Sequence, residues 1–328
     1  MNAMPPPQPV LEVERLSTVF DLRAGTVRSV NDVSFSLKRG EILGIVGESG
    51  SGKSVTGLSV LGLIEPPGRI AAGSIRLEGR ELTTLGDAEK RKLRGNAISM
   101  IFQDPMTTLN PVLSIGRQFF EVINAHRTVS FATALDEAEA ALVQVGIPAA
   151  RERLSSYPHE LSGGMRQRVC IAMSLINKPA VVIADEPTTA LDVTIQAQIL
   201  NMMQNLVQDS DVSLIWVTHD LSVVAGLCDR VAVMYAGRIV ETGPVEDVLR
   251  NPRHPYTRGL LDSIPGDAEP GRRLRQVPGT QPSPLDLPHG CSFRPRCSQA
   301  RDECKEEPAS DQVGPDHFVR CLFKLGGN

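Results

Sequence analysis

The chain has 328 residues, enough for one large or two ordinary domains, and 41% of them are hydrophobic. Its formal net charge of −4 argues against a protein that coats nucleic acid, because such proteins carry basic stripes or patches. No apolar run reaches the ~18–20 residues of a membrane span. The start, MNAMPPPQPV, lacks the basic residues and apolar run of a signal peptide. We therefore expect a globular protein that is neither exported nor membrane-spanning.

Strand-like and helix-like segments alternate over the first 250 residues, which is typical of an α/β protein. The segment EILGIV is apolar enough to be a strand buried on both faces. The segment VAVMYAGRIVETG predicts a hairpin that turns at Ala236 and Gly237. The predicted strands cover residues 10–20, 41–46, 98–102, 180–184, 213–218 and 231–235.

Helical patterns lie between these strands. Residues 104–165 include LDEAEAALVQVG, closed by Gly146 and Pro148, and indicate a helical insertion. Another helix is expected after Asp192, a suitable N-cap. Its apolar residues recur at spacings of four, three and four, which predicts one buried face made of Ile195, Ile199, Met202 and Leu206.

A glycine-rich loop, GESGSGKS, directly follows the strand EILGIV and precedes an apolar helix. This is the strand–loop–helix context of a phosphate-binding loop, in which glycines let backbone N–H groups surround the phosphates. Lys53 is expected to reach the β- and γ-phosphates of ATP, and Ser54 to bind Mg²⁺. The predicted ATP-binding residues here are Gly47, Glu48, Ser49, Gly50, Ser51, Gly52, Lys53, Ser54 and Val55.

Polar residues follow several apolar strands. The strand AVVIA leads into Asp185, which is expected to hold Mg²⁺, and Glu186, which is expected to activate or orient the attacking water. Gln103 follows the strand ISMIF, and His219 follows the strand SLIWVT. The loop and the acidic strand end alone therefore predict a P-loop NTPase that uses Mg²⁺, rather than an ordinary glycine-rich turn.

The string LSGGMRQR at 161–168 offers a hydroxyl, bare backbone amides and a helix N-terminus, all suited to an anion. Together with the phosphate loop and the acidic strand end, in this order, it resembles the ATP-binding subunit of an ABC transporter. The strings FQDPMTTLNP and HPYTRGLL are similar to those of the peptide importer family, which includes dipeptide, oligopeptide and related nickel systems. The resemblance covers almost the whole chain, with Phe20 where tyrosine is more usual and Thr108 where serine is common.

This resemblance implies an α/β fold: a P-loop ABC-type nucleotide-binding domain with an antiparallel β subdomain and a helical subdomain. Residues 1–250 would form that domain, and residues 251–328, which hold eleven of the 24 prolines, a small cysteine-containing extension. Phe20 would stack on adenine, Gln103 would contact Mg²⁺ or water, and His219 would contact the γ-phosphate. The catalytic set would be Glu186, His219, Gln103 and Lys53, with Mg²⁺ on Ser54, Gln103 and Asp185.

The resemblance also implies a dimer, because the serine-glycine-glycine turn of such ATPases serves the ATP held by the opposite subunit. The loop at 189–192 resembles the segment that links one nucleotide site to its twin. Residues 103–116 would lie in the groove that receives a helix of the membrane subunit. The residues serving the partner's ATP would be Leu161, Ser162, Gly163, Gly164, Met165 and Asp192.

Six cysteines occur, which in a chain without an export signal indicates thiols or metal ligands rather than disulfides. Cys170 and Cys228 lie in predicted core segments and are expected to be buried. The other four have five, six and sixteen residues between them, which is too open for a usual zinc pair. An iron–sulfur cluster tolerates such spacing, and the family resemblance favours [4Fe–4S]; zinc and unligated thiols are the alternatives. The four are Cys291, Cys297, Cys304 and Cys321.

The favoured function is an ATP-hydrolysing motor subunit that energises import of di- and oligopeptides. The implied partners are a second, related ABC ATPase, two transmembrane permease subunits and a solute-binding protein, with no nucleic acid, at the cytoplasmic face of the cell membrane. One alternative is import of nickel chelate or another small solute. A soluble ABC ATPase of translation or DNA repair would show tandem nucleotide domains or long coiled-coil insertions, and a regulatory module would lack catalytic residues; neither pattern is present.

Overall fold

A computed structural model describes residues 8–189, 191–264 and 276–326. The chain divides into two compact units, each with its own core. Within the described residues, one unit comprises 8–10, 38–41 and 84–215, and the other comprises 11–37, 42–83 and 216–326.

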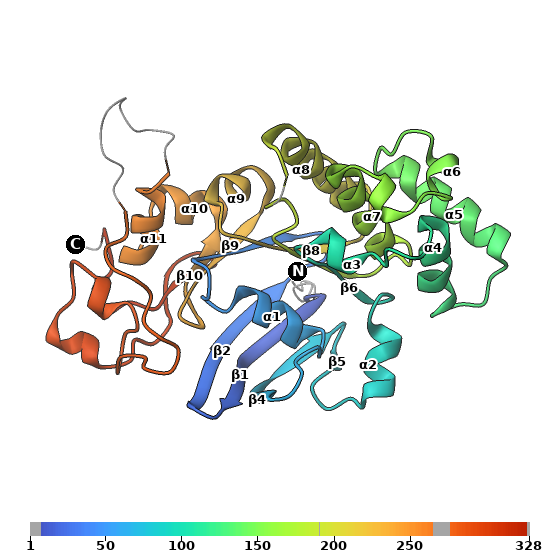
Figure 1. The fold of residues 1–328 in the computed structure, drawn as a ribbon. Helices are drawn as coiled ribbons and strands as arrows, with labels where there is room; N and C mark the ends of the chain where they lie inside the picture. The colour runs from blue at the N-terminus through green and yellow to red at the C-terminus, as the bar shows by residue number, and fades with distance from the viewer. Residues whose placement is uncertain (1–7, 190, 265–275, 327–328) are drawn as a thin grey trace, which may run out of the picture. The chain divides into compact units, whose positions relative to one another are not determined.

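The second of these units contains a four-stranded antiparallel sheet that fits the expected β subdomain (Figure 1). Its central strand β1 is interrupted by register shifts, and Arg15 and Asp32 adopt left-handed φ angles of 50° and 55° at such irregularities. The strand order is β2 (Gly25–Leu37), β1 (Leu11–Leu22), β4 (Gly68–Leu77) and β5 (Arg80–Glu81).

The same unit holds the strand that leads to the phosphate loop. β3 (Ile42–Val46) is buried along its whole length, as predicted, and pairs in parallel with β9 (Arg230–Tyr235). The expected hairpin joins β9 to β10 (Arg238–Pro244), and its turn residues Ala236 and Gly237 have φ angles of 46° and 82°. Two positive φ angles in a two-residue turn match the twist of the flanking strands.

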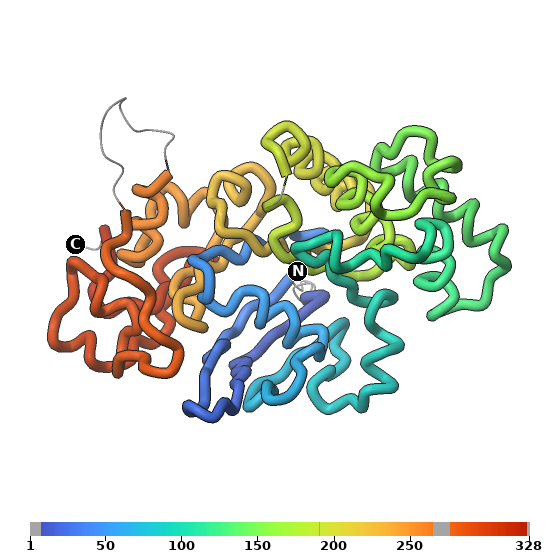
Figure 2. The backbone as a smooth tube through the Cα atoms, viewed as in Figure 1, coloured from blue at the N-terminus to red at the C-terminus, as the bar shows by residue number. Residues whose placement is uncertain are grey.

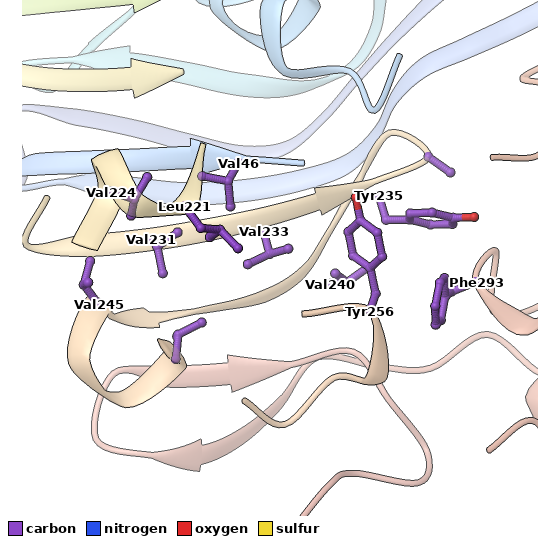
Figure 3. Packing of buried hydrophobic residues seen from close by; sticks show 12 residues of the cluster. Val46, Leu221, Val224, Val231, Val233, Tyr235, Val240, Val245, Tyr256 and Phe293 are labelled. Atoms are coloured by element: carbon purple, nitrogen blue, oxygen red, sulfur yellow. The ribbon is translucent and has the colours of Figure 1, made fainter. Parts of the chain in front are cut away.

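Valine-rich strands and three helices form the core of this unit (Figure 3). The rings of Tyr235, Tyr256 and Phe293 lie together at one end, with Tyr235 and Tyr256 centroids 4.7 Å apart and Phe293 within 5.3 Å of both. Fully buried aromatic pairs of this kind add to the stability gained from burying apolar area. The helices are α9 (Leu221–Leu227), α10 (Val245–Arg250) and α11 (Pro255–Leu261), and α1 (Lys53–Val60) follows the phosphate loop.

Residues 276–326 run mostly as irregular loops, as the tube in Figure 2 shows. Two short strands continue the sheet, because β12 pairs antiparallel with both β10 and β11. The regular elements of this stretch are the 3₁₀ helices η3 (Arg294–Arg296) and η4 (Asp302–Lys305) and the strands β11 (Asp311–Gly314) and β12 (His317–Val319).

The other unit is built on β6 (Ile98–Ile101) and β7 (Val181–Asp185), which pair in parallel. β8 (Ser213–Thr218) begins in this unit. Helices occupy the range in which they were expected, and α4, α5 and α7 pack on one another (Figure 1). The helices of this unit are α2 (Asp87–Leu93), α3 (Pro105–Thr108), α4 (Ile115–Asn124), α5 (Phe131–Gln144), α6 (Ala150–Arg153), the 3₁₀ helix η1 (Pro158–Glu160), α7 (Gly163–Leu175) and α8 (Val193–Gln208).

Helix ends and faces follow the sequence closely, with one difference. α5 ends where Gly146 adopts a φ of 73°, as a left-handed C-terminal residue does. In α8 the predicted Ile199 and Leu206 are buried, whereas the predicted Ile195 and Met202 are only half-buried. Met203 and Val207 complete the buried face, which is therefore turned toward the residues that follow the predicted ones. No helix in the described ranges is long and apolar enough to cross a membrane.

Candidate active site

The phosphate loop connects β3 to α1, and its backbone requires glycine at two places. Gly47 and Gly52 have φ angles of 156° and 101°. A Cβ atom on Gly47 would lie 2.2 Å from the carbonyl oxygen of Met234, and one on Gly52 would lie 2.3 Å from that of Ser29. No side chain can be accommodated at such distances, so the loop's path depends on both glycines.

Lys53 is the first residue of α1, and only 4% of it is exposed. Its Nζ donates hydrogen bonds to the carbonyl oxygens of Gly47 (2.8 Å) and Glu48 (3.1 Å), so the ammonium lies within the loop. Ser51 is fully buried, and its Oγ has no hydrogen-bond partner in the part of the chain that the structure describes. A buried ammonium, a buried hydroxyl and a helix N-terminus together suit a polyphosphate.

The remaining residues predicted for ATP lie on the same unit. Ser49 and Gly50 are exposed, whereas Ser54 and Val55 are half-buried in the first turn of α1. Phe20 lies near the end of β1, and its half-buried ring packs against the backbone of Gly68. Adenine stacking on Phe20 stays a prediction.

The two parallel strands of the other unit bring the predicted acidic groups together. β6 and β7 are in register from Ile98 opposite Val181 onward, so their carboxyl ends coincide. Gln103 Nε2 donates a hydrogen bond of 3.4 Å to Glu186 Oε2. Asp185 ends β7 and is 8% exposed.

Glu186 is held in an uncommon backbone conformation. Its φ is 45°, in the left-handed region that non-glycine residues rarely adopt. Thr189 Oγ1 donates a hydrogen bond of 3.0 Å to the same carboxylate oxygen that Gln103 contacts. Strained residues of this kind concentrate at functional sites, where the surrounding structure holds them.

His219 follows β8 and belongs to the unit that carries the phosphate loop. Its side chain is exposed. The next residue, Asp220, caps α9 by accepting a hydrogen bond from the backbone N–H of Ser222 at 2.8 Å. The cap fixes the start of this helix, and thereby the backbone that carries His219.

The serine-glycine-glycine turn begins α7. Ser162 is exposed, and its Oγ accepts a hydrogen bond from Met165 N at 3.3 Å, so it is the helix N-cap. Gly163 and Gly164 leave the helix N-terminus bare, and a Cβ on Gly164 would lie 2.9 Å from Ile195 Cγ2. Leu161 is buried and anchors the turn. The turn thus presents backbone N–H groups on an exposed helix end.

Asp192 has a related position at the start of α8, where its Oδ1 accepts from Ile195 N at 3.0 Å. It is exposed and caps the helix as predicted. Ala190, in the loop before it, lies outside the described residues.

Cysteines in the C-terminal region share one small pocket. All four predicted ligands line it, together with His254 and Phe293. Burial raises the pKa of the Cys291 and Cys297 thiols, and raises that of Cys321 to about 11. Within the described ranges, however, no three histidine, cysteine or acidic side chains stand close enough together to hold a metal ion.

The two remaining cysteines are packed against apolar groups. Cys170 is buried as predicted, and burial raises the pKa of its thiol to about 12. Cys228 as a whole residue is half-buried, and its Sγ lies close to the backbone of Gly44. A Cβ atom added to Gly44 would be only 3.0 Å from this Sγ. Burial raises the pKa of this thiol as well. Both thiols are protonated at neutral pH and suit the apolar role expected for them.

Sequence reasoning missed a set of contacts on the phosphate loop from the C-terminal region. Glu48 N donates to Tyr256 Oη at 3.0 Å, and Arg296 forms a two-point ion pair with the Glu48 carboxylate. Tyr256 lies in the string HPYT, which served only as a family marker. No periodicity signals a contact across 208 residues of sequence, so only the fold reveals it.

Known proteins with similar sequences and folds also contain an ATP-binding domain of this kind. The ABC transporter family model matches residues 30–189, and the model for the oligopeptide/dipeptide transporter C-terminal region matches residues 240–304. The dimeric ATP-binding cassette MJ0796, in a post-hydrolysis state bound to ADP and Pi, has a TM-score of 0.64 and 26% identity, covering 72% of this chain and 98% of that one. Fold and site define an ABC-type P-loop ATPase.

Two relatives show to which family of ABC transporter ATP-binding proteins the chain belongs. The oligopeptide transport ATP-binding protein OppD of Escherichia coli is 49% identical, over 95% of this chain and 93% of its own length. The dipeptide transport ATP-binding protein DppD of the same organism is 46% identical, over 96% and 97%. The chain belongs to the oligopeptide/dipeptide family of ABC transporter ATP-binding proteins.

Proposed function

We propose that this chain is the ATP-hydrolysing motor subunit of an importer of di- and oligopeptides. The observation that carries the proposal is the presence, in one chain, of a glycine-dependent phosphate loop with a buried lysine and a C-terminal region of the oligopeptide/dipeptide type. The similarity to OppD and DppD extends over nearly the whole chain. Peptide import is therefore favoured over nickel chelate import and over a non-transport ATPase.

The chemistry assigned to each residue is that of phosphoryl transfer to water. Lys53 and the loop amides bind the phosphates, and Mg²⁺ is held by Ser54, Gln103 and Asp185. Glu186 orients the attacking water and receives its proton, with its carboxylate held in place by Gln103 and Thr189.

Two further groups complete the proposed site. His219 contacts the γ-phosphate, and Phe20 stacks on the adenine. One group of residues contacts the ATP held by a second ATPase subunit. It comprises Leu161, Ser162, Gly163, Gly164, Met165 and Asp192. ATP then bridges two subunits, and hydrolysis releases the bridge; the ligand shifts the equilibrium between two states by binding one of them better.

The proposed complex contains a related second ATPase, two transmembrane permease subunits and a solute-binding protein. This chain would lie at the cytoplasmic face of the membrane, where Phe102, Met106 and Val112 offer exposed apolar side chains to a permease. Exposed apolar groups gathered in one segment are typical of interaction surfaces. The division into a nucleotide-binding domain over 1–250, with its helical insertion at about 104–165, and an extension over 251–328 is part of the same proposal.

The proposal also includes a [4Fe–4S] cluster on Cys291, Cys297, Cys304 and Cys321, because all four cysteines line one pocket. A bound cluster would stabilise a loop-rich region that has little regular structure of its own. Iron, zinc and sulfide analysis of the anaerobically purified wild type and Cys304→Ser tests it. Absence of stoichiometric iron in the wild type, or full iron content in the variant, contradicts the four-cysteine cluster.

The transport function is tested with the native complex. The tagged chain is purified from native membranes in detergent, and co-purifying chains are identified by mass spectrometry. We expect a second ATPase and two polytopic proteins. After reconstitution in proteoliposomes with the solute-binding protein, a mixed di- and oligopeptide pool is expected to stimulate ATP hydrolysis, and nickel chelate is not. Stimulation by nickel chelate alone, or recovery with ribosomes or repair factors, overturns the proposal.

A further inference from the structure

The Arg296 side chain is 5% exposed and has every donor satisfied. Its two terminal nitrogens donate to the Glu48 carboxylate at 2.6 and 2.9 Å, in the two-point geometry that suits guanidinium and carboxylate. Nε donates to the carbonyl oxygen of Pro278 at 2.7 Å. The remaining two N–H groups reach Tyr235 Oη at 3.5 Å and the carbonyl oxygen of Val277 at 3.4 Å. All five N–H groups are thereby used, so the guanidinium is fixed in one orientation.

Glu48 is held by the C-terminal region through its backbone as well as its side chain. Its amide N–H donates to Tyr256 Oη at 3.0 Å, and its own carbonyl oxygen accepts from Lys53 Nζ at 3.1 Å. Two residues further along the loop, the carbonyl oxygen of Gly50 accepts from Gln281 Nε2 at 3.2 Å. The phosphate loop is therefore fastened at three points by residues more than 200 positions away in the sequence.

The anchor of Arg296 is itself rigid. η3 places Arg296 between Phe293 and Cys297, and Cys297 lines the cysteine pocket. Phe293 packs on Tyr235 and Tyr256 (Figure 3). The guanidinium also lies 5.7 Å from the centre of the Tyr235 ring. A buried cation with a fixed backbone and an aromatic neighbour has little freedom to move away from its partner.

The opposite charges of Glu48 and Arg296 bear on how the loop binds ATP. Glu48 places a carboxylate in a loop that must accept a polyphosphate, and an unpaired carboxylate would repel that ligand. Arg296 neutralises it through the two-point ion pair, and the hydrogen bonds to Glu48 raise the pKa of the guanidinium. The ion pair both fixes the loop and removes the repulsion.

We propose that Arg296 is a positioning residue of the ATP site, acting through Glu48. The C-terminal region then contributes to nucleotide binding by this chain through its contacts with Glu48. This inference rests on the proposed ATPase function. Loss of Arg296 frees the Glu48 carboxylate. The repulsion between this unneutralised carboxylate and the phosphates is expected to lower ATP affinity on the order of tenfold, which corresponds to about 1.4 kcal/mol.

The test uses the full chain in its native complex, with a fluorescent ATP analogue for binding and phosphate release for kcat and KM. Arg296→Ala is expected to raise Kd and KM for ATP about tenfold with a much smaller change in kcat. Adding Glu48→Gln to Arg296→Ala is expected to restore most of the affinity, because it removes the charge that repels ATP. Arg296→Lys, which keeps the charge but not the two-point geometry, is expected to fall between wild type and Arg296→Ala.

Arg294→Ala is the matched control, because Arg294 lies on the same 3₁₀ helix, whereas the arginine that contacts the Glu48 carboxylate is Arg296. It is expected to bind ATP like the wild type. Glu48→Gln alone keeps the size of the Glu48 side chain and removes its charge. It takes the place of Arg296→Ala in the experiment if Arg296→Ala does not fold. An unchanged Kd in folded Arg296→Ala overturns the inference, as does a double variant no better than Arg296→Ala. A wild type that neither binds nor hydrolyses ATP contradicts the proposed function instead.

Discussion

Gln103 and Glu186 follow neighbouring parallel strands and are joined by a hydrogen bond of 3.4 Å between Nε2 and Oε2. The same Glu186 oxygen accepts from Thr189 at 3.0 Å, and the residue's φ of 45° turns its backbone away from the strand. Two donors thus contact the carboxylate of a residue whose backbone is itself in an uncommon conformation. That degree of fixation is what a water-orienting group requires.

Glu186→Gln is expected to bind ATP as the wild type does and to hydrolyse it about 10²–10⁴-fold more slowly. The amide retains the size of the side chain but cannot receive the proton of the attacking water. Phosphate release and binding of a fluorescent nucleotide, measured in the native complex, separate the two effects. Unchanged turnover removes Glu186 from this role. Glu65→Gln, at an exposed position in the other unit, serves as the control.

Ser162 has two roles that substitution can separate. Ser162→Ala removes the helix cap and is expected to lower the free energy of unfolding by about 1 kcal/mol. Ser162→Asp keeps a capping oxygen for Met165 N but places a carboxylate where the partner's ATP is proposed to lie. We expect Ser162→Asp to keep wild-type stability and to lose most ATPase activity in the complex. Full activity in Ser162→Asp would confine Ser162 to helix capping.

Gly52→Ala tests the steric requirement of the phosphate loop. Its φ of 101° and the 2.3 Å approach to the carbonyl oxygen of Ser29 leave no room for a methyl group. Gly40→Ala is the matched control, because Gly40 also has a positive φ, 70°, but has nothing within 4 Å of its Cβ position.

Thermal and urea unfolding compare the two variants. Gly40→Ala is expected to lose about 1–2 kcal/mol of stability from the left-handed backbone alone. Gly52→Ala is expected to lose more, and to lose ATP binding as well. Equal losses in both variants would show that the loop adjusts without cost to the added methyl group.

The Glu81 carboxyl group is expected to make the free energy of unfolding depend on pH in the acidic range. Partial burial opposes its ionisation, but hydrogen bonds from Ser74 and Thr83 outweigh it and hold the pKa of the carboxyl at about 2, against an ordinary 4.5. A depressed pKa contributes stability that is present above about pH 4.5 and is lost as the pH falls toward 2. The free energy of unfolding of the wild type should therefore fall more steeply over this window than that of Glu81→Gln.

Urea unfolding at pH 6 and pH 3 measures the difference. The advantage of the wild type over Glu81→Gln is expected to be larger at pH 6. Glu65→Gln makes the same substitution at an exposed site and is the matched control. An equal advantage at both values would mean that Glu81 does not carry the expected linkage.

The sequence predicted the buried strands and the helix ends because each has a strong local signal. EILGIV and AVVIA are continuous apolar runs, Gly146 marks a helix end, and Ala236 and Gly237 form a two-residue turn. The strands β2 and β4 were missed. β2 is interrupted at Asp32, whose left-handed φ breaks the alternation of buried and exposed side chains on which strand prediction depends.

Prediction of the site succeeded where a motif encodes a backbone path, as at Gly47, Gly52 and Lys53. It failed for Tyr256 and Arg296, because their contacts with Glu48 depend on how distant segments pack. Arginine beside a cysteine in a proline-rich stretch has no pattern that distinguishes a surface charge from a buried one. Only its exposure of 5% does so.

The ion pair of Glu48 and Arg296 spans 248 positions of the chain, and this has a consequence for synthesis. A ribosome makes Glu48 on the order of tens of seconds before Arg296, at the usual rates of elongation. Until then the nascent phosphate loop carries an unpaired carboxylate. From the role proposed for Arg296, chains that stop before it are expected to keep every nucleotide motif but to bind ATP more weakly. Synthesis of the C-terminal region, rather than completion of the motifs, would then give the protein its full affinity for ATP.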